Sequence, residues 1–381
     1  MLHLPPLYPI TDASRAEPLS RQIQRLGEAG FPLVQFRGKP LGTGSQWEEL
    51  RKALAESAAK GGWPWICVND RADLALLAIR EGLSPWGLHL GQEDLPASEA
   101  RRLPGLEKCH LGASTHAPGE WNAVDPACDH AGVGPFRGTA TKTDHAPPIG
   151  LEGLAAGCAA LRHQGLAPIA IGGLEPGDAE ACFDAGAESL AMVGALHRAA
   201  DPAEAGWLAQ RARWRARPPF RPGQGLALIG GSGAGKSALG REVAQRLSLP
   251  FLDLDTAIAA AAGRSIADLF ATQGEPAFRH LEQACLLRAL EHPAVLALGA
   301  GAWEDPGSRR AVAAAGFQPL WLAEPPPRAW ARVAGDPARP LAQDRAGFLA
   351  RWAARTPAWA LAPMLLPFGH TSRELAAALL D

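Results

Sequence analysis

The sequence predicts two consecutive α/β domains, a (β/α)8 TIM barrel followed by a three-layer α/β domain of the P-loop NTPase type. At 381 residues the chain is longer than a single hydrophobic core usually becomes. Short apolar runs alternate with helical stretches over residues 7–196, which is the pattern of parallel strands joined by helices. The alternation restarts at Leu226 with a strand and a glycine-rich loop. We therefore expect a second α/β domain after the first.

Eight short apolar runs are the expected strands of the barrel. They lie at residues 7–10, 33–36, 65–68, 88–90, 109–113, 130–133, 168–171 and 189–193. The clearest helices between and after them are expected at 17–29, 45–60, 71–81, 150–163 and 176–185. Eight strand-helix repeats in about 200 residues are typical of a TIM barrel, whose functional side chains follow the C-terminal strand ends. An open doubly wound sheet is the alternative, because the helices near 97–102 and 117–124 are poorly marked.

An arginine- and proline-rich stretch separates the two domains. From Arg211 to Gly225 the chain has four Arg in seven residues and then three Pro, a composition that interrupts or stiffens a chain rather than building a core. We expect the barrel at 1–208, a linker at 209–224 and the P-loop domain at 225–381. The alternative role for the arginine run is a surface patch that docks an anionic partner.

Composition and charge favour a cytoplasmic globular protein. Hydrophobic residues make up 47%, charged residues 20%, and the net charge is −2, so neither a nucleic-acid nor a membrane partner is implied. The six cysteines form no CxxC pair, which fits a reducing compartment. We recognise no signal peptide and no apolar run of about 18 residues. The oligomeric state is not indicated.

A phosphate-binding loop opens the second domain. Residues 230–237 read GGSGAGKS and match GxxxxGK[ST] between an expected strand at 226–229 and an expected helix at 237–247. Backbone N–H groups of such a loop surround phosphates, Lys236 reaches the β and γ oxygens, and the Ser237 hydroxyl is offered to Mg²⁺. The expected ATP-binding residues are Gly230, Gly231, Ser232, Gly233, Ala234, Gly235, Lys236 and Ser237. Further strands are expected at 251–255, 295–299 and 319–322.

Polar and charged residues follow most of the barrel strands. They are Gln35, Arg37, Lys39, Asn69, Asp70, Arg71, Asp94, Ser114, His116, Thr139, Thr141 and Lys142, with glycine turns at Gly172, Gly173 and Gly194. Cations, hydroxyls and glycine turns at one mouth indicate a pyrophosphate site. Two carboxylates there repel, so one takes up a proton unless a cation lies between them. Asp70 and Asp94 therefore predict Mg²⁺, although any single residue of the set could be a helix cap or a surface ion pair.

Residues 4–200 resemble thiamine phosphate synthase. The matching stretches are LYPITD (7–12), VQFRGK (34–39), VNDRADLAL (68–76), GLHLGQEDLP (87–96), GASTH (112–116), VGPFRGTATK (133–142) and AIGGL (170–174). The resemblance implies that Asp70 and Asp94 bind Mg²⁺ and that five side chains hold the pyrophosphate of a hydroxymethylpyrimidine substrate. These are Arg37, Lys39, Asn69, Thr141 and Lys142. It also implies that Gln35, Ser114 and Thr139 place the pyrimidine and the thiazole phosphate, whose phosphate lies at Gly172, Val193 and Gly194.

The resemblance implies a dissociative displacement. Mg²⁺, Arg37 and Lys142 neutralise the departing pyrophosphate, and the thiazole nitrogen captures the pyrimidinyl-methyl cation. One departure is the absence of the usual Ser from Met192-Val193-Gly194, after the last strand. A related branch of the fold tautomerises the thiazole with a histidine near position 116, and a non-catalytic partner domain is a further alternative. The retained NDR, GQED and TATK segments favour the synthase.

The second domain resembles shikimate kinase. The matching segments are Phe251-Leu-Asp253-Leu-Asp255, Gly274-Glu275 with Phe278-Arg279 and Glu282, Arg339-Pro340-Leu341, and Arg355-Thr-Pro357. The resemblance implies that Asp253 supports Mg²⁺, that Asp255 is catalytic and holds the substrate hydroxyls, and that Arg279 and Arg355 bind its carboxylate. Arg339 then belongs to the lid over ATP, and Gly299 and Gly301 belong to the substrate loop.

Two departures affect the identity of the kinase substrate. Ala300 stands inside the family's Gly-Gly-Gly loop and Trp359 replaces an expected Tyr. A Cβ at position 300 could block a close backbone contact or demand a disfavoured φ. We expect shikimate as substrate, and the alternative is another small polyol or an intermediate of thiamine synthesis. Because the metal carboxylates and Lys236 are all present, the sequence favours a bifunctional enzyme over a scaffold.

Overall fold

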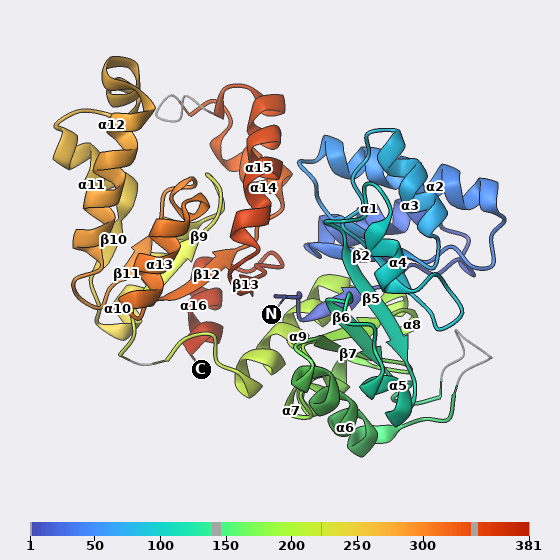
Figure 1. Cartoon of the computed structure of the whole chain (residues 1–381). Coiled ribbons are helices and arrows are strands. Elements are labelled where there is room, and N and C mark those ends of the chain that lie inside the picture. Colours follow the sequence, from blue (N-terminus) through green and yellow to red (C-terminus); the bar gives the residue numbers. More distant parts are fainter. Residues whose placement is uncertain (1, 139–145, 222, 337–341, 381) are drawn as a thin grey trace. The chain divides into compact units, whose positions relative to one another are not determined.

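The computed structural model in Figure 1 describes the chain except residues 1, 139–145, 222, 337–341 and 381. The chain divides into two compact units, Met1–Arg217 and Pro218–Asp381. In Figure 1 the first unit runs from blue to yellow-green and the second from yellow to red. Each unit has its own parallel sheet.

The first unit is a barrel of eight parallel strands in the order β1-β8-β7-β6-β5-β4-β3-β2. The strands are β1 (Leu7–Pro9), β2 (Leu33–Phe36), β3 (Trp65–Asn69), β4 (Gly87–Leu90), β5 (His110–Thr115), β6 (His130–Val133), β7 (Ala167–Ile171) and β8 (Ser189–Met192). A bridge between Ile10 and Gln35 joins the two ends of the sheet, and Thr11 N donates to Gln35 O at 2.9 Å. The barrel prediction is therefore confirmed over the open-sheet alternative.

Helices separate the strands of the barrel. They are α1 (Leu19–Ala29), α2 (Thr43–Ala59), α3 (Ala72–Arg80), α4 (Ala97–Arg102), α5 (Pro118–Asn122), α6 (Gly150–His163), η1 (Pro176–Asp178), α7 (Ala179–Asp184) and α8 (Gly194–Arg198). The apolar spacing of α1 buries Leu19, Ile23 and Leu26, and Gly30 ends the helix at a φ of 112°, a conformation that favours glycine. The two poorly marked helices, α4 and α5, exist but are only six and five residues long.

The expected linker 209–224 is wrong in its first part. Helix α9 (Pro202–Ala216) begins where Asp201 accepts from Ala203 N, and it buries Ala212 and Trp214. Two arginines of the stretch, Arg213 and Arg217, each lie 2.6 Å from a carboxylate oxygen of buried Glu188, whereas Arg215 is exposed. Local composition could not indicate Glu188 as the partner of these arginines, because it lies in a different segment of the sequence. The helix therefore belongs to the barrel unit.

The second unit contains a five-stranded parallel sheet in the order β10-β11-β9-β12-β13. The strands are β9 (Leu226–Ile229), β10 (Phe251–Asp253), β11 (Val295–Ala297), β12 (Gln318–Leu322) and β13 (Met364–Leu365). The helices are α10 (Lys236–Leu247), α11 (Leu254–Ala262), α12 (Ile266–Ala289), η2 (Ala302–Glu304), α13 (Pro306–Ala314), α14 (Pro326–Val333), α15 (Arg345–Trp359) and α16 (Ser372–Leu380). Gly274 kinks α12 at a φ of 76°. The central strand β9 leads directly into the glycine-rich loop.

Among the described residues, no helix combines the length and apolarity that crossing a membrane requires.

Candidate functional site

The C-terminal strand ends of the barrel carry the residues that the sequence singled out. Gln35 lies in β2, Asn69 ends β3, and Ser114 lies in β5. Asp70 follows β3 with a φ of 63°, a left-handed conformation that Asp tolerates better than most residues. The Asp70 N–H donates to the His89 carbonyl at 2.8 Å. This bond fixes Asp70 at the mouth beside the end of β4.

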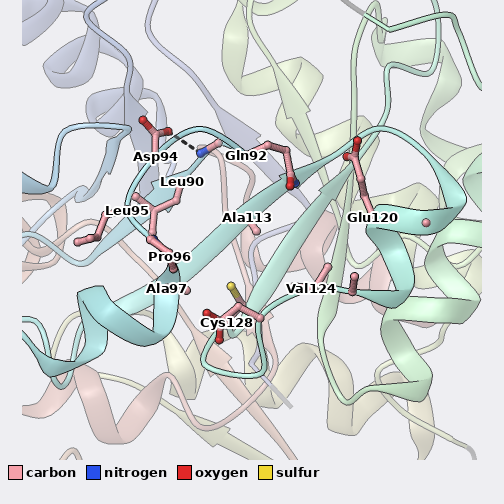
Figure 2. Close-up of a pocket in the computed structure, with 14 residues that line it drawn as sticks. Leu90, Gln92, Asp94, Leu95, Pro96, Ala97, Ala113, Glu120, Val124 and Cys128 are labelled. Atoms are coloured by element: carbon pink, nitrogen blue, oxygen red, sulfur yellow. Dashed lines mark hydrogen bonds between the residues drawn. The ribbon is translucent and has the colours of Figure 1, made fainter.

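Two carboxylates meet beside Gly91. Asp94 Oδ2 accepts from Gly91 N at 2.6 Å, the bond dashed in Figure 2. A Cβ placed on Gly91 would lie 3.0 Å from Asp94 Oδ2 and 4.0 Å from Asp70 Oδ1. Lys39 Nζ lies 2.6 Å from Asp70 Oδ2. Burial raises the pKa of Asp94, and the neighbouring Asp70 carboxylate raises it further, as expected for two close acids.

The donor set suits Mg²⁺. No cluster of three or more His, Cys, Asp or Glu side chains that could hold a metal occurs in the described part of the chain. Two carboxylates with water and substrate oxygens are a common ligand set for Mg²⁺, which prefers oxygen and keeps several waters. Asp70 and Asp94 would hold the ion, and the charge that raises the Asp94 pKa would be offset by it.

Two side chains inside the barrel reach residues of the expected pyrimidine site. His89 Nε2 and Ser114 Oγ lie 3.0 Å apart, and Gln35 Nε2 donates to Tyr8 OH at 3.5 Å. Burial lowers the pKa of His89 to about 4, so its ring is neutral at physiological pH. Sequence reasoning missed His89 and Tyr8. The sequence offered one signal for His89: side chains alternate between the two faces of a strand, so a polar residue inside β4 can point into the barrel toward the site.

A cavity of about 330 Å³ adjoins Asp94. Figure 2 shows Asp94 and Glu120 on opposite sides of it, with Cys128 at the base. The Glu120 carboxylate accepts from His116 N at 2.7 Å and lies 3.1 Å from His116 Nδ1, so His116 is held beside this cavity. Burial raises the pKa of Cys128 to about 12, which keeps it as a thiol.

The other residues expected to bind phosphate that the structure describes follow the C-terminal ends of β2, β7 and β8. Gly172 follows β7 with a φ of 98°, and a Cβ there would lie 2.6 Å from Pro135, so the turn requires glycine. Val193 and Gly194 follow β8. Arg37 N donates to Thr11 Oγ1 at 2.8 Å, which anchors the turn after β2. The expected residues Thr139, Thr141 and Lys142 lie outside the described residues.

The phosphate-binding loop of the second unit has the expected strand-loop-helix setting. Gly230, Gly233 and Gly235 have φ values of 140°, 82° and 100°. Ser232 and Ala234 lie between them, and a Cβ on Gly231 would collide with the Trp352 ring. The loop can therefore adopt this shape only with glycine at these positions.

Lys236 and Ser237 begin α10. Lys236 Nζ donates to the Gly230 and Gly231 carbonyls at 2.8 and 3.0 Å. Ser237 Oγ donates to Asp253 Oδ2 at 2.6 Å. A hydroxyl beside a carboxylate at the foot of a phosphate loop is a donor set that fits Mg²⁺. Asp253 also begins α11, because its side chain accepts from Thr256 N.

The residues expected to bind the second substrate converge at the end of β11. A Cβ on Gly299 would lie 2.8 Å from Asp255 Oδ1, and one on Gly301 would lie 3.0 Å from Arg279 Nη1. Arg279 pairs with Glu282 at 2.7 Å. The structure thus brings Asp255, Arg279 and the two glycines together.

Arg355 is linked to the same loop by Glu304, a residue that the sequence analysis did not single out. Arg355 Nε lies 2.9 Å from Glu304 Oε1, and that oxygen lies 3.3 Å from the position of a Cβ on Gly301. A single acidic residue after the loop gave no distinct signal. The expected lid residue Arg339 lies outside the described residues.

The two departures from the kinase pattern contact each other. Trp359 Nε1 donates to the Ala300 carbonyl at 3.1 Å. Among the described non-glycine residues, only Asp70, Ser248 and Phe368 have positive φ, so Ala300 is not in a disfavoured conformation. The strain considered from the sequence is absent, and only the volume of its Cβ remains.

Comparison with known proteins gives a separate match for each of the two units. The thiamine monophosphate synthase model matches residues 7–196 and the shikimate kinase model matches 232–361. The thiamine-phosphate synthase of Chloroflexus aurantiacus is 38% identical over 51% of this chain and 86% of its own length. That of Laribacter hongkongensis is 38% identical over 46% and 77%. A shikimate kinase structure from Acinetobacter baumannii, in complex with shikimate, is 29% identical over 41% of this chain and 90% of its own, with a TM-score of 0.39. The chain is therefore an enzyme of the thiamine-phosphate synthase family, and it carries a second unit that the shikimate kinase model matches.

Proposed function

We propose that the barrel couples hydroxymethylpyrimidine diphosphate with thiazole phosphate, giving thiamine phosphate and pyrophosphate. The observation that supports this proposal is the Lys39–Asp70 ion pair beside Asp94, which brings one cation together with two carboxylates that could hold Mg²⁺. Mg²⁺ would supply positive charge to that diphosphate. Arg37 and Lys142 would neutralise the charge that develops on the leaving group.

The coupling needs no general base. The bond between the methylene carbon and the diphosphate oxygen breaks, and its electron pair leaves with pyrophosphate. The lone pair of the thiazole nitrogen then forms the new C–N bond, and no proton is removed. Ser114, held near His89 at 3.0 Å, would orient the substrate rings, and Gln35, Asn69 and Thr139 would assist it.

For the second unit we propose transfer of the γ-phosphate of ATP to a hydroxyl of a small carboxylated polyol, with shikimate as the first candidate. Arg279 lies beside Gly301, and Arg355 pairs with Glu304, which also lies beside it. Both arginines would hold the carboxylate, because guanidinium pairs with carboxylate in a planar geometry. Asp255 would bind the hydroxyl that attacks phosphorus and accept its proton. The phosphoryl group moves to that oxygen, and ADP leaves.

A different carboxylated substrate is the second candidate. The observation that favours it is the Trp359–Ala300 hydrogen bond at 3.1 Å, which holds the buried indole of α15 against a loop that carries a methyl group at position 300. A substrate that is less polar than shikimate at this position, or that approaches the loop less closely, would suit this wall better.

Two assays on the purified full chain test these proposals. Pyrophosphate release is measured with the pyrimidine diphosphate and thiazole phosphate, and ADP release with shikimate, gluconate, thiamine phosphate and hydroxymethylpyrimidine. Asp70→Asn should abolish only the first reaction, and Lys236→Ala only the second, so each variant is the control for the other. Failure of wild-type pyrophosphate release overturns the barrel proposal. ADP release that is independent of all four acceptors overturns the kinase proposal.

A further inference from the structure

A pocket of about 230 Å³ continues from the phosphate-binding loop. Ala234 and Gly235 of the loop line it, together with Pro367 and His370. If the loop binds the phosphates of a nucleotide, as proposed above, the nucleoside part would bind in this pocket. The inference below therefore depends on the proposed phosphoryl transfer.

Glu324 and Arg332 line this pocket and form an ion pair in which only the acid is buried. Arg332 Nη1 lies 3.2 Å from Glu324 Oε2 and donates to the Gly233 carbonyl at 3.1 Å. The Glu324 side chain is 2% exposed, whereas that of Arg332 is 50% exposed. The guanidinium is thus tied on one side to a buried acid and on another to the phosphate loop.

The ion pair is not expected to stabilise the fold much. Glu324 Oε1 is buried without a hydrogen-bond partner among the described residues. Burial raises the pKa of Glu324, although Arg332 and Arg328 oppose this. Removing a carboxylate from water is costly, and one ion pair often fails to compensate for it. A buried carboxylate that is only partly hydrogen-bonded, in a pocket wall and in contact with an arginine, points to a role in holding that arginine.

We propose that Glu324 is a positioning residue that fixes the Arg332 guanidinium as one wall of the nucleoside pocket. A planar guanidinium stacks on aromatic rings, which an ammonium does not. The base of the nucleotide would lie against this plane while the phosphates bind the loop. Glu324 acts through Arg332 and does not touch the reacting phosphorus.

The test compares ATP with inorganic tripolyphosphate, which has the phosphates but no nucleoside. Binding of each, with Mg²⁺, is measured by calorimetry on the full chain for wild type, Glu324→Gln and Arg332→Lys. Both variants should weaken ATP by about tenfold and leave tripolyphosphate within about twofold. In turnover, KM for ATP should rise while kcat changes little. Glu291→Gln, at an exposed position of the same unit, removes the same charge and should change neither ligand.

Thermal unfolding without nucleotide separates positioning from a structural role. Glu324→Gln should unfold at the wild-type temperature or higher, because it removes a half-satisfied buried charge. Equal weakening of ATP and tripolyphosphate, or a large drop in unfolding temperature with unchanged ATP affinity, overturns the positioning role. A wild-type protein that binds neither ligand overturns the proposed phosphoryl transfer itself. Wild-type affinity of Glu324→Gln and Arg332→Lys for ATP overturns only the inference about Glu324.

Discussion

The acid pair of the barrel shows what single residues reveal before a structure is known. Asp70 and Asp94 belong to different strand ends, and their meeting was predictable because such ends share one rim of a barrel. The 2.6 Å pairing of Lys39 with Asp70 was not predictable, since a flexible ammonium can reach several partners. The His89–Ser114 contact was missed for a related reason. His89 and Ser114 both lie within strands, where a polar side chain cannot be recognised from the sequence as part of a site.

Asp94→Asn should abolish pyrophosphate release and leave ADP release unchanged. The amide keeps the shape that accepts from Gly91 N at 2.6 Å but loses the charge that attracts a divalent cation. Pyrophosphate release is measured across a Mg²⁺ titration, and ADP release from the same preparation is the control. Wild-type rates of pyrophosphate release at low Mg²⁺ would show that Asp94 is not a metal ligand.

Ala300→Gly should raise kcat/KM for shikimate by about tenfold if its Cβ blocks one substrate contact. The Trp359 bond is to the backbone carbonyl and survives the change, so KM for ATP should stay constant. Steady-state kinetics with both substrates varied give the two values. An unchanged kcat/KM for shikimate, at an ordinary rate, would mean that the methyl group is harmless.

Whole elements were predicted better than contacts between distant ones. Each barrel strand lies within about two residues of its expected position, because apolar runs bounded by polar ones mark buried strands well. Strand β13 was missed, since two residues are too short for a periodic signal. Helix α9 was misassigned, because the acid that its arginines bind cannot be found from local composition.

The inward-facing histidines of β4 and β6 should make the barrel acid-sensitive. Burial lowers the pKa of His89 to about 4 and that of His130 well below its usual 6.5. The unfolded chain takes up these protons from about pH 6.5 downward, whereas the folded barrel does not. Stability from this source is therefore complete above pH 6.5 and is lost as the pH falls toward 4. For His89 the full difference corresponds to about 3 kcal/mol.

His130→Phe isolates this effect. Neither ring nitrogen of His130 has a hydrogen-bond partner among the described residues, so a phenyl ring removes no bond. Thermal unfolding of wild type and variant is compared at pH 5 and pH 7.5, and the variant should lose less stability on acidification. His163→Phe, on the barrel helix α6, controls for the loss of a histidine elsewhere. Equal acid sensitivity of wild type and His130→Phe would exclude His130 as a cause.

At the scale of the whole molecule, two α/β units are joined in one chain, as length and the restarted pattern indicated. The position of the junction was the least predictable part, because charge and proline content describe a segment without its tertiary partners. Helix α9 contributes Trp214 to the buried core, and Arg213 Nη1 donates to the Leu4 carbonyl at 2.5 Å. The end of the first unit is therefore tied to its beginning.

A chain ending at Arg217 should fold and release pyrophosphate, whereas one ending at Leu208 should not. The shorter fragment loses Trp214 and leaves Glu188 without two of its arginine partners, and an unpaired buried acid is strongly destabilising. Solubility, thermal unfolding and pyrophosphate release are compared for both fragments. A stable and active fragment ending at Leu208 would show that α9 is dispensable.

The order of the barrel strands also has a consequence during protein synthesis. Strand β1 pairs with β8, where Leu7 lies opposite Leu190. The edge of β1 that binds β8 therefore stays unpaired until nearly two hundred residues have left the ribosome. Pairing over such a separation is slow, and open strand edges expose the nascent chain to aggregation. In the second unit the first strand made, β9, is central, and its neighbours β11 and β12 follow later. The barrel should therefore depend more on chaperones than the unit synthesised after it.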